Sequence, residues 1–504
     1  MSVSRRDFLG LTAAASALVA AGPHALAASG GGLSFEEYRQ FDALGLAAAI
    51  RRGHFTAGEV LAAALARTAA VNPAINAVVI GHADYARQQL ADGVGHGPFA
   101  GVPFLLKDLG MQLRGTVTSQ GSRFYAGRVA DHTDTLVQRY LDAGLLMMGK
   151  SASPEFGGTT TTESLLYGAT RNPWDLTKTT GGSSGGAAAA VAAGILPMAN
   201  ATDGGGSIRI PASCCGLFGL KPSRGRTPHG PQALTSLMSV SHCVSRSVRD
   251  SAALLDASAA MEPGAAGGPP PPSMSFLQAS QTPPQPQRIG LVLTPISGSP
   301  VDSDCRTAVE QSAALLESLG HRVEPIELPI DAGEFFQATG VVMAAGNVAR
   351  IQQRERELGR AVTEDDLEPL IYQRYRNALA HTAADYHRAV NSLHRIGAKL
   401  ATLHQQYPLL LSPTLANPPL PIGRLALTRL DSGYLSDVLS YSAFTMLANA
   451  SGAPAASLPL HWSDEGLPIG VMLSADYGGE ALLLQVAGQL EQAQPWFDRT
   501  PTNL

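Results

Sequence analysis

Two serines and one lysine are the residues of this chain whose types and positions point to covalent catalysis. Ser183 lies in the motif GGSSGG, and Ser207 follows a run of three glycines 207 − 183 = 24 positions later. A serine hydroxyl becomes a nucleophile only when a base accepts its proton. None of the 13 histidines lies between residues 133 and 228, so a site built from this segment alone needs another base. A histidine from elsewhere in the chain could still be the base, because the members of a catalytic triad can be remote in sequence. Lys107 lies in the apolar string Val102–Leu109, and burial lowers the pKa of a lysine toward a neutral amine that can accept a proton.

The glycines before Ser207 have a physical task of their own. Gly204, Gly205 and Gly206 let the backbone turn without Cβ clashes, so their N–H groups can converge with that of Ser207. Such donors stabilise the oxyanion of a tetrahedral intermediate. Taken alone, GGSSGG is typical of a flexible linker, and Lys107 is typical of a surface lysine. The alanine-rich run that follows GGSSGG, and the apolar neighbours of Lys107, favour packed structure instead.

The elements that must position these residues follow an alternating pattern. Thr56–Glu59 is a capping box, and apolar residues then repeat with helical spacing until Asn72-Pro73 stops the predicted helix. A strand is predicted at Ile75–Ile80, a second helix at Thr135–Ala143 and a second strand at Leu145–Gly149. Alternating helices and apolar strands predict an α/β fold.

The second half of the chain continues this pattern around two unusual segments. Residues 263–286 are rich in proline, glycine and alanine, and predict a surface linker or excursion that is not core. Residues 335–403 are predicted to be mostly helical, with charge clusters typical of solvated helix faces. Further strands are predicted at Ile289–Leu293, Val323–Leu328, Pro408–Ser412, Ala455–Leu460 and Gly470–Leu473, and helices at Cys305–Leu319 and Glu480–Gln492.

Composition narrows the classes of partner. The 504 residues are 45% hydrophobic and 15% charged, with a formal net charge of −5, which favours a large globular core and offers no general attraction for nucleic acid. Four cysteines, at 214, 215, 243 and 305, are too few for a disulfide framework, and no spacing resembles a zinc site. We therefore expect a small-molecule substrate, no nucleic acid, no metal and no cofactor. The sequence leaves a homodimer open.

The first 27 residues predict an export signal that is separate from the fold. Ser4–Leu9 resembles the twin-arginine signature, Leu11–Ala21 is mildly apolar, and Ala25–Ala27 is a small-residue cleavage site. The apolar run is shorter than the ~20 residues that span a bilayer. These features predict cleavage after Ala27, no membrane anchor after cleavage, and a periplasmic or secreted location.

Several longer motifs make the chain resemble the amidase signature family of Ser-Ser-Lys amide hydrolases. They are GVPFLLKD, GATRNPWD, TTGGSSGGAAAAVAAG, TDGGGSIRIPASCCGLFGLKPSRGR, SRSVRD, ASGAPAASLPL and GLPIGVML. The resemblance is dense from Phe99 to about Asp250 and weaker from Tyr441 to Trp496. It implies an α/β fold with a large mixed twisted sheet covered by helices on both faces. It also implies one amidase domain over 28–504, in which the variable helical region 335–403 forms part of the pocket.

The resemblance also implies a role for each candidate residue. Ser207 is the acylated nucleophile, Ser183, in a cis peptide conformation, is the bridging serine, and Lys107 is the base. The backbone N–H groups of Gly204, Gly205, Gly206 and Ser207 are the oxyanion donors, and Asp203 and Arg209 pair to brace the loop. Many members have a bulkier residue at the position of Gly204, so a more mobile loop or a wider pocket is expected here.

Two other functions stay open on the same scaffold. One is an amidotransferase subunit that hydrolyses glutamine, which the export signal disfavours because its partners are cytoplasmic. The other is a non-catalytic binding protein, which the complete set of Lys107, Ser183 and Ser207 disfavours. The closest branch resembles hydrolases of nylon-related cyclic amide oligomers. The sequence does not distinguish a peptide amide, fatty amide, anilide, lactam oligomer or carbamate as substrate.

Overall fold

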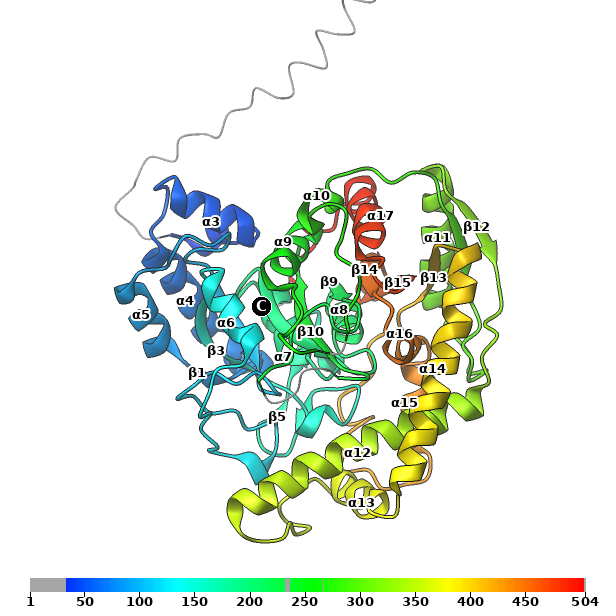
Figure 1. Cartoon of the computed structure of the whole chain (residues 1–504). Helices are drawn as coiled ribbons and strands as arrows, with labels where there is room; N and C mark the ends of the chain where they lie inside the picture. Colours follow the sequence, from blue (N-terminus) through cyan, green and yellow to red (C-terminus); the bar gives the residue numbers. More distant parts are fainter. Residues whose placement is uncertain (1–32, 232–235, 266, 503–504) are drawn as a thin grey trace, which may run out of the picture.

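The computed structural model of the chain describes residues 33–231, 236–265 and 267–502. The predicted export signal at 1–27 lies outside these residues. Within them, no helix combines the length and the apolar character needed to cross a membrane. The fold consists of a large and a small β-sheet, two short hairpins and the helices packed around them (Figure 1).

The large sheet has eight strands in the order β12-β11-β13-β15-β14-β9-β10-β8. β11 runs parallel to β12 and β13, whereas the other neighbouring strands are antiparallel, so the predicted mixed sheet is confirmed. Its strands are β8 (Met198–Asp203), β9 (Phe218–Lys221), β10 (Val240–Ser245), β11 (Arg288–Leu291), β12 (Arg322–Pro325), β13 (Leu409–Pro413), β14 (Ala455–Trp462) and β15 (Pro468–Ala475).

Helices cover both faces of this sheet. Successive side chains of each strand point to opposite faces, so apolar residues on both faces can pack against helices. Leu409 and Leu411 of β13 belong to one hydrophobic cluster, whereas Leu410 between them faces the opposite side. The first cluster includes α9 (Val248–Ser258), α10 (Phe276–Ser280), α11 (Ser303–Ser318) and α17 (Glu480–Ala493). On the opposite side, Leu410 lies beside Leu400 of α14 (Ala383–Gln406) and Leu447 of α16 (Met446–Ser451).

The small sheet has the order β1-β3-β2 and carries Lys107 at its end. β1 (Val78–Gly81) is antiparallel to β3 (Leu146–Ser151), which is parallel to β2 (Pro103–Lys107). Phe104 and Leu106 of β2 share one hydrophobic cluster with Ala188 of α7 (Gly185–Ala192) and Ala201 of β8. The two sheets therefore contribute to one continuous core, which sets β2 close to β8.

One predicted helix end is wrong. The helix that begins at the Thr56 capping box, α4 (Ala57–Ile75), continues through Pro73 instead of stopping there. Proline removes one N–H donor from the helix, but the backbone hydrogen bonds of the residues after it do not use that donor. The Asn72 side chain accepts the N–H groups of Ala77 and Val78, at 2.8 Å each, and so completes the helix end.

The proline-rich segment 263–286 is not wholly a surface excursion, which corrects that prediction. It contains α10, where Phe276 and Ala279 are buried in the cluster shared with α9 and α17. The Asp256 carboxylate accepts the N–H groups of Phe276 and Leu277 at 2.7 and 2.8 Å. The apolar pair at i and i+3 inserts into the core even though the flanking composition is typical of a linker.

The segment 335–403 is helical, as predicted, and forms an outer layer together with its flanks (Figure 1). It comprises α12 (Ala332–Leu358), α13 (Pro369–Ala378) and α14. The remaining elements are α2 (Phe35–Tyr38), α3 (Ala43–Arg51), α5 (Ala83–Asp92), η1 (Arg123–Tyr125), α6 (Thr135–Asp142), η2 (Glu155–Gly157), β4 (Glu163–Ser164), β5 (Gly168–Ala169), β6 (Arg171–Asn172), β7 (Asp175–Thr179), α8 (Arg209–Cys215) and α15 (Tyr434–Tyr441).

Candidate active site

Lys107 is fully buried where β2 ends. Its Nζ donates to the Ser183 hydroxyl at 2.7 Å and to the Thr202 hydroxyl of β8 at 2.9 Å. Its backbone N–H donates to Asn200 Oδ1 at 3.1 Å, which ties β2 to β8. Burial lowers the pKa of Lys107 well below its ordinary value, an effect that the Asp203 carboxylate offsets only in part. A neutral amine beside a serine hydroxyl can exchange a proton with it.

Ser183 lies in the tight turn between β7 and α7, and it is 2% exposed. The peptide bond between Gly182 and Ser183 is cis, as the resemblance implies. A Cβ on Gly182 would lie 2.2 Å from the Thr161 carbonyl oxygen, so this position needs glycine. Ser184 holds the turn against β8, since its hydroxyl both accepts the Thr202 N–H and donates to the Thr202 carbonyl, at 3.2 Å each.

Ser207 lies in the loop between β8 and α8, and its side chain is partly exposed. Gly206 has φ +133°, a conformation that side chains rarely adopt, and a Cβ there would lie 2.4 Å from Thr445 Oγ1. At Gly204, by contrast, the nearest atom to an added Cβ is Ser239 Cβ at 3.8 Å. The loop therefore has room for a side chain at Gly204.

The predicted set of oxyanion donors needs one correction. The Gly206 N–H donates to Asp203 Oδ1 at 2.7 Å, so it is part of the loop's internal support. Among the described residues, no acceptor takes the N–H groups of Gly204, Gly205 or Ser207. Three of the four predicted donors are therefore available to a ligand. Sequence reasoning missed the difference because it depends on how the Asp203 carboxylate folds back over the loop.

Asp203 and Arg209 pair as predicted, and both are fully buried. Arg209 Nε and Nη2 donate to the two carboxylate oxygens at 2.9 Å each, and the Ile208 N–H donates to Asp203 at 3.1 Å. Burial opposes ionisation of Asp203, but Arg209, with contributions from Lys221 and Asn449, outweighs it and holds the Asp203 pKa below its usual range. The pair is a fixed support under the loop.

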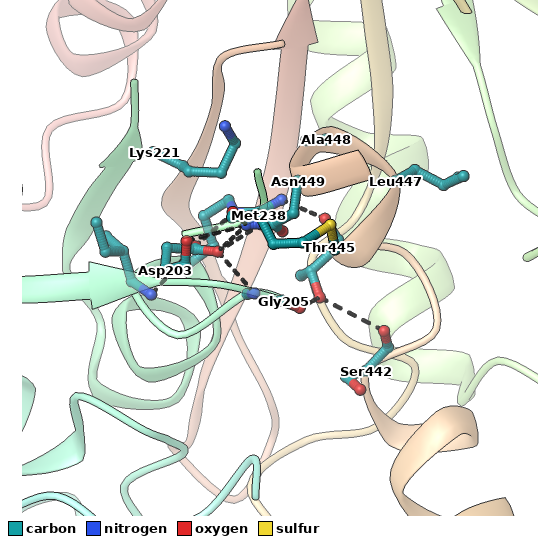
Figure 2. A network of polar contacts seen from close by, with 12 residues as sticks. Asp203, Gly205, Lys221, Met238, Ser442, Thr445, Leu447, Ala448 and Asn449 are labelled. Atoms are coloured by element: carbon teal, nitrogen blue, oxygen red, sulfur yellow. Dashed lines mark hydrogen bonds and ion pairs between the residues drawn. The ribbon is translucent and has the colours of Figure 1, made fainter. Parts of the chain in front are cut away.

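Two residues of the C-terminal part complete this support, and the sequence did not single them out. Figure 2 shows Thr445 and Asn449 beside Asp203 and Gly205. The Thr445 hydroxyl donates to the Gly205 carbonyl at 2.6 Å, and Asn449 Nδ2 donates to Asp203 Oδ1 at 2.9 Å. Asn449 Oδ1 accepts from Arg209 at 2.7 Å. No local motif marks these positions, since their partners lie some 240 residues earlier in the chain.

Among the residues that the structure describes, Lys107 is one of three fully buried lysines, and its neighbours distinguish it. Lys150 donates to the Met111 carbonyl at 2.6 Å and to the Thr118 hydroxyl. Lys221 donates to the carbonyl of Pro222 at 2.9 Å, and burial together with Arg209 lowers the pKa of Lys221 to about 7. Of the three amines, that of Lys107 contacts Ser183. Burial alone therefore does not identify a catalytic base.

The helical region reaches the edge of the site through the turn that follows β3. Gly157 faces Ser183, because an added Cβ would lie 3.0 Å from Ser183 Oγ. Arg374 of α13 donates to the neighbouring Gly158 carbonyl at 2.7 Å. Glu155 Oε2 accepts the N–H of Glu368, which precedes α13, at 2.7 Å. The turn beside Ser183 is thus held from outside by the helical region.

Similarity to known proteins agrees with this arrangement. A family model described as Amidase matches residues 59–484. The chain belongs to the amidase family. Over 476 residues it is 38% identical to the 6-aminohexanoate-cyclic-dimer hydrolase of Paenarthrobacter ureafaciens, and the alignment covers 91% of this chain and 96% of that relative. Over 471 residues it is 38% identical to the putative amidase AmiC of Mycobacterium leprae (strain TN), and that alignment covers 90% of this chain and 95% of the relative.

Solved structures of the family have the same fold. The structure of 6-aminohexanoate cyclic dimer hydrolase aligns with a TM-score of 0.88 at 38% identity, and the alignment covers 92% of this chain and 99% of that one. The structure of that hydrolase complexed with substrate aligns equally well. The amidase resemblance and the fold predicted from the sequence are confirmed. As a member of this family, the protein is an amide hydrolase, an enzyme that acts on carbon–nitrogen bonds.

Proposed function

We propose that the protein cleaves carboxamides through an acyl-enzyme on Ser207, with Ser183 and Lys107 as the proton relay. The observation that carries this proposal is the 2.7 Å contact between Lys107 Nζ and Ser183 Oγ. The same amine contacts Thr202, five positions before Ser207, so it reaches the strand that leads into the nucleophile loop.

The relay passes protons between Ser207, Ser183 and Lys107. Neutral Lys107 accepts the Ser183 proton while Ser183 accepts that of Ser207, and Ser207 Oγ forms a bond to the amide carbonyl carbon. Ser183 then donates a proton to the leaving nitrogen as the C–N bond breaks, and protonated Lys107 returns a proton to Ser183. Water attacks the resulting ester while Ser183 accepts a proton from it and passes its own to Lys107. Ser183 then donates a proton to Ser207 Oγ as the ester C–O bond breaks, Lys107 restores the Ser183 proton, and the acid product leaves.

The developing oxyanion needs donors that are not already engaged. The N–H groups of Gly204, Gly205 and Ser207 meet this requirement among the described residues, whereas the Gly206 N–H is held by Asp203. Donors fixed before the reaction stabilise negative charge without reorganising during it. The buried Asp203–Arg209 pair supplies that rigidity.

For the substrate, we propose a linear or cyclic carboxamide, with cyclic amide oligomers as the first class to test. The likeness to 6-aminohexanoate-cyclic-dimer hydrolase, at 38% identity over nearly the whole of both chains, supports this choice. Hydrolysis should be measured for 6-aminohexanoate cyclic dimer, anilides, fatty amides, peptide amides and carbamates under the same conditions. If none of these is hydrolysed, the proposal of carboxamide cleavage is wrong.

Labelling by a fluorophosphonate probe tests the assigned residues. Ser207→Ala should abolish labelling and hydrolysis while the unfolding midpoint stays near that of the wild type. Lys107→Met should slow acylation by about 10²–10⁴-fold, the usual contribution of a general base. The wild-type rate of acylation should fall as the pH is lowered through the pKa of Lys107, because the protonated amine cannot accept a proton. The rate of Lys107→Met should not show this pH dependence. Lys150→Met is the control, because it also removes a buried lysine, and its rate should keep the pH dependence of the wild type. Persistent labelling of Ser207→Ala would exclude Ser207 as the nucleophile.

We also propose that the protein is exported by the twin-arginine pathway and cleaved after Ala27. The order of the arginine pair, the apolar run and the small-residue site in the first 27 residues supports this proposal. Cell fractionation and N-terminal sequencing should find the mature protein outside the cytoplasm, beginning at Ala28. Replacing Arg5 and Arg6 by lysine should retain it inside, and unchanged export of that variant would refute the proposal.

A further inference from the structure

The short helix α16 and the residue before it contact the loop that carries Ser207 at several points, although they lie more than 200 residues later in the chain. Thr445, directly before α16, and Asn449 are four residues apart and lie on the same side of that helix. They are 0% and 1% exposed, and their side chains meet the loop at Gly205 and Asp203 (Figure 2). Fully buried polar side chains usually satisfy their hydrogen bonds, and here the partners are the loop itself.

The peptide units of the loop are fixed one at a time. In a trans peptide the carbonyl and the N–H point in opposite directions, so an anchored carbonyl sets the direction of the N–H. Asn449 Nδ2 donates to the Asp203 carbonyl at 3.0 Å, which aims the Gly204 N–H away from α16. The Gly206 carbonyl accepts the Ile210 N–H at 2.7 Å, which aims the Ser207 N–H.

The peptide between Gly205 and Gly206 is held at both ends. Its carbonyl accepts the Thr445 hydroxyl at 2.6 Å, and its N–H donates to Asp203 Oδ1 at 2.7 Å. Neither group of this unit is free to face a substrate. This peptide unit therefore has a fixed orientation, and it lies in the chain between Gly204 and Ser207.

Asn449 and Thr445 also bind the support beneath the loop. Asn449 Oδ1 accepts from Arg209 Nη2 at 2.7 Å, and the Thr445 carbonyl accepts from Arg209 Nη1 at 2.7 Å. The Met238 carbonyl also lies 3.1 Å from Asn449 Nδ2 and shares its two hydrogens with the acceptors of Asp203. One amide thus contacts both members of the Asp203–Arg209 pair.

We propose that Thr445 and Asn449 are positioning residues for the oxyanion donors: Asn449 orients the Gly204 peptide, and Thr445 fixes the Gly205–Gly206 peptide that precedes the Ser207 donor. They act through the loop backbone and do not touch the substrate. This inference rests on the proposed role of the loop in amide hydrolysis. It predicts an effect on the transition state that exceeds any effect on substrate binding, because the donors act where negative charge develops.

A matched pair of variants tests this at Thr445. Thr445→Val keeps the shape of the side chain and removes the hydroxyl, whereas Thr445→Ser keeps the hydroxyl. We expect Thr445→Val to lower kcat by about 10–100-fold, somewhat less than the loss of an oxyanion donor itself, with KM within about threefold of the wild type. Thr445→Ser should recover kcat to within about threefold. Equal kcat values for Thr445→Val and the wild type would overturn the inference for Thr445, as would a loss confined to KM.

A second variant keeps the inference testable if Thr445→Val does not fold. Asn449→Leu keeps a side chain of similar size without adding a charge beside Asp203, and it loses the donor to the Asp203 carbonyl, so kcat should fall while KM stays nearly constant. Unfolding midpoints identify any variant that loses activity by unfolding. Ser207→Ala in the same assay separates the two proposals. If Ser207→Ala keeps the activity of the wild type, the proposed function is refuted. If Ser207→Ala is inactive while the Thr445 and Asn449 variants are fully active, only the positioning roles are refuted.

Discussion

Replacing Asp203 by asparagine tests the physical basis of the nucleophile loop. The Asp203 carboxylate accepts five hydrogen bonds, at 2.7 to 3.1 Å, from Arg209 Nε and Nη2, the N–H groups of Gly206 and Ile208, and Asn449 Nδ2. Asparagine presents an N–H₂ group where one of these donors points, and it leaves the Arg209 cation buried without a counter-charge. Breaking a buried ion pair from one side costs about 3–5 kcal/mol, so we expect Asp203→Asn to lower the free energy of unfolding by this amount.

Equilibrium urea unfolding, followed by the fluorescence of the three tryptophans, measures the change. The double variant Asp203→Asn with Arg209→Met removes both charges, and it should be less destabilised than Asp203→Asn alone. Glu324→Gln is the surface control, because the Glu324–Arg288 pair is solvent-screened, and its midpoint should stay close to that of the wild type. If Asp203→Asn unfolds at the same urea concentration as Glu324→Gln, the pair does not stabilise the loop and the reasoning fails.

Two further predictions concern the loop and the turn beside Ser183. Gly206→Ala should lose fluorophosphonate labelling, because Gly206 has φ +133° and an added Cβ would lie 2.4 Å from Thr445 Oγ1. Gly204→Ala should keep labelling, because the nearest atom to its Cβ, Ser239 Cβ, would be 3.8 Å away. Equal labelling of the two variants would contradict the steric account. Burial raises the pKa of Glu155 to about 8, so its contribution to stability is fully present below the ordinary pKa of about 4.5 and is lost as the pH rises through about 8. The melting temperature of Glu155→Gln should therefore fall less than that of the wild type over this range, and parallel curves would refute the assignment.

The sequence was sufficient where chemistry and backbone needs are local. Ser183 and Ser207 were identifiable because they lie in glycine-rich loops, and Lys107 because its neighbours are apolar. The helices at 335–403 followed from the residue pattern, since each element carries its own pattern, whereas the mixed sheet was implied by the family resemblance. The helix end at Pro73 was misjudged because one missing N–H matters little in a last turn that Asn72 completes.

Tertiary structure decided how the loop is held. The role of the Gly206 N–H depends on where the Asp203 carboxylate lies, and Thr445 and Asn449 reach the loop only because the chain returns to it some 240 residues later. Composition predicted residues 263–286 to lie outside the core, yet Phe276 fills a space between α9 and α17 that exists only in the folded chain. By itself, then, the sequence determined which groups can do the chemistry. The directions of the backbone donors depend on hydrogen bonds between remote residues, which no local pattern encodes.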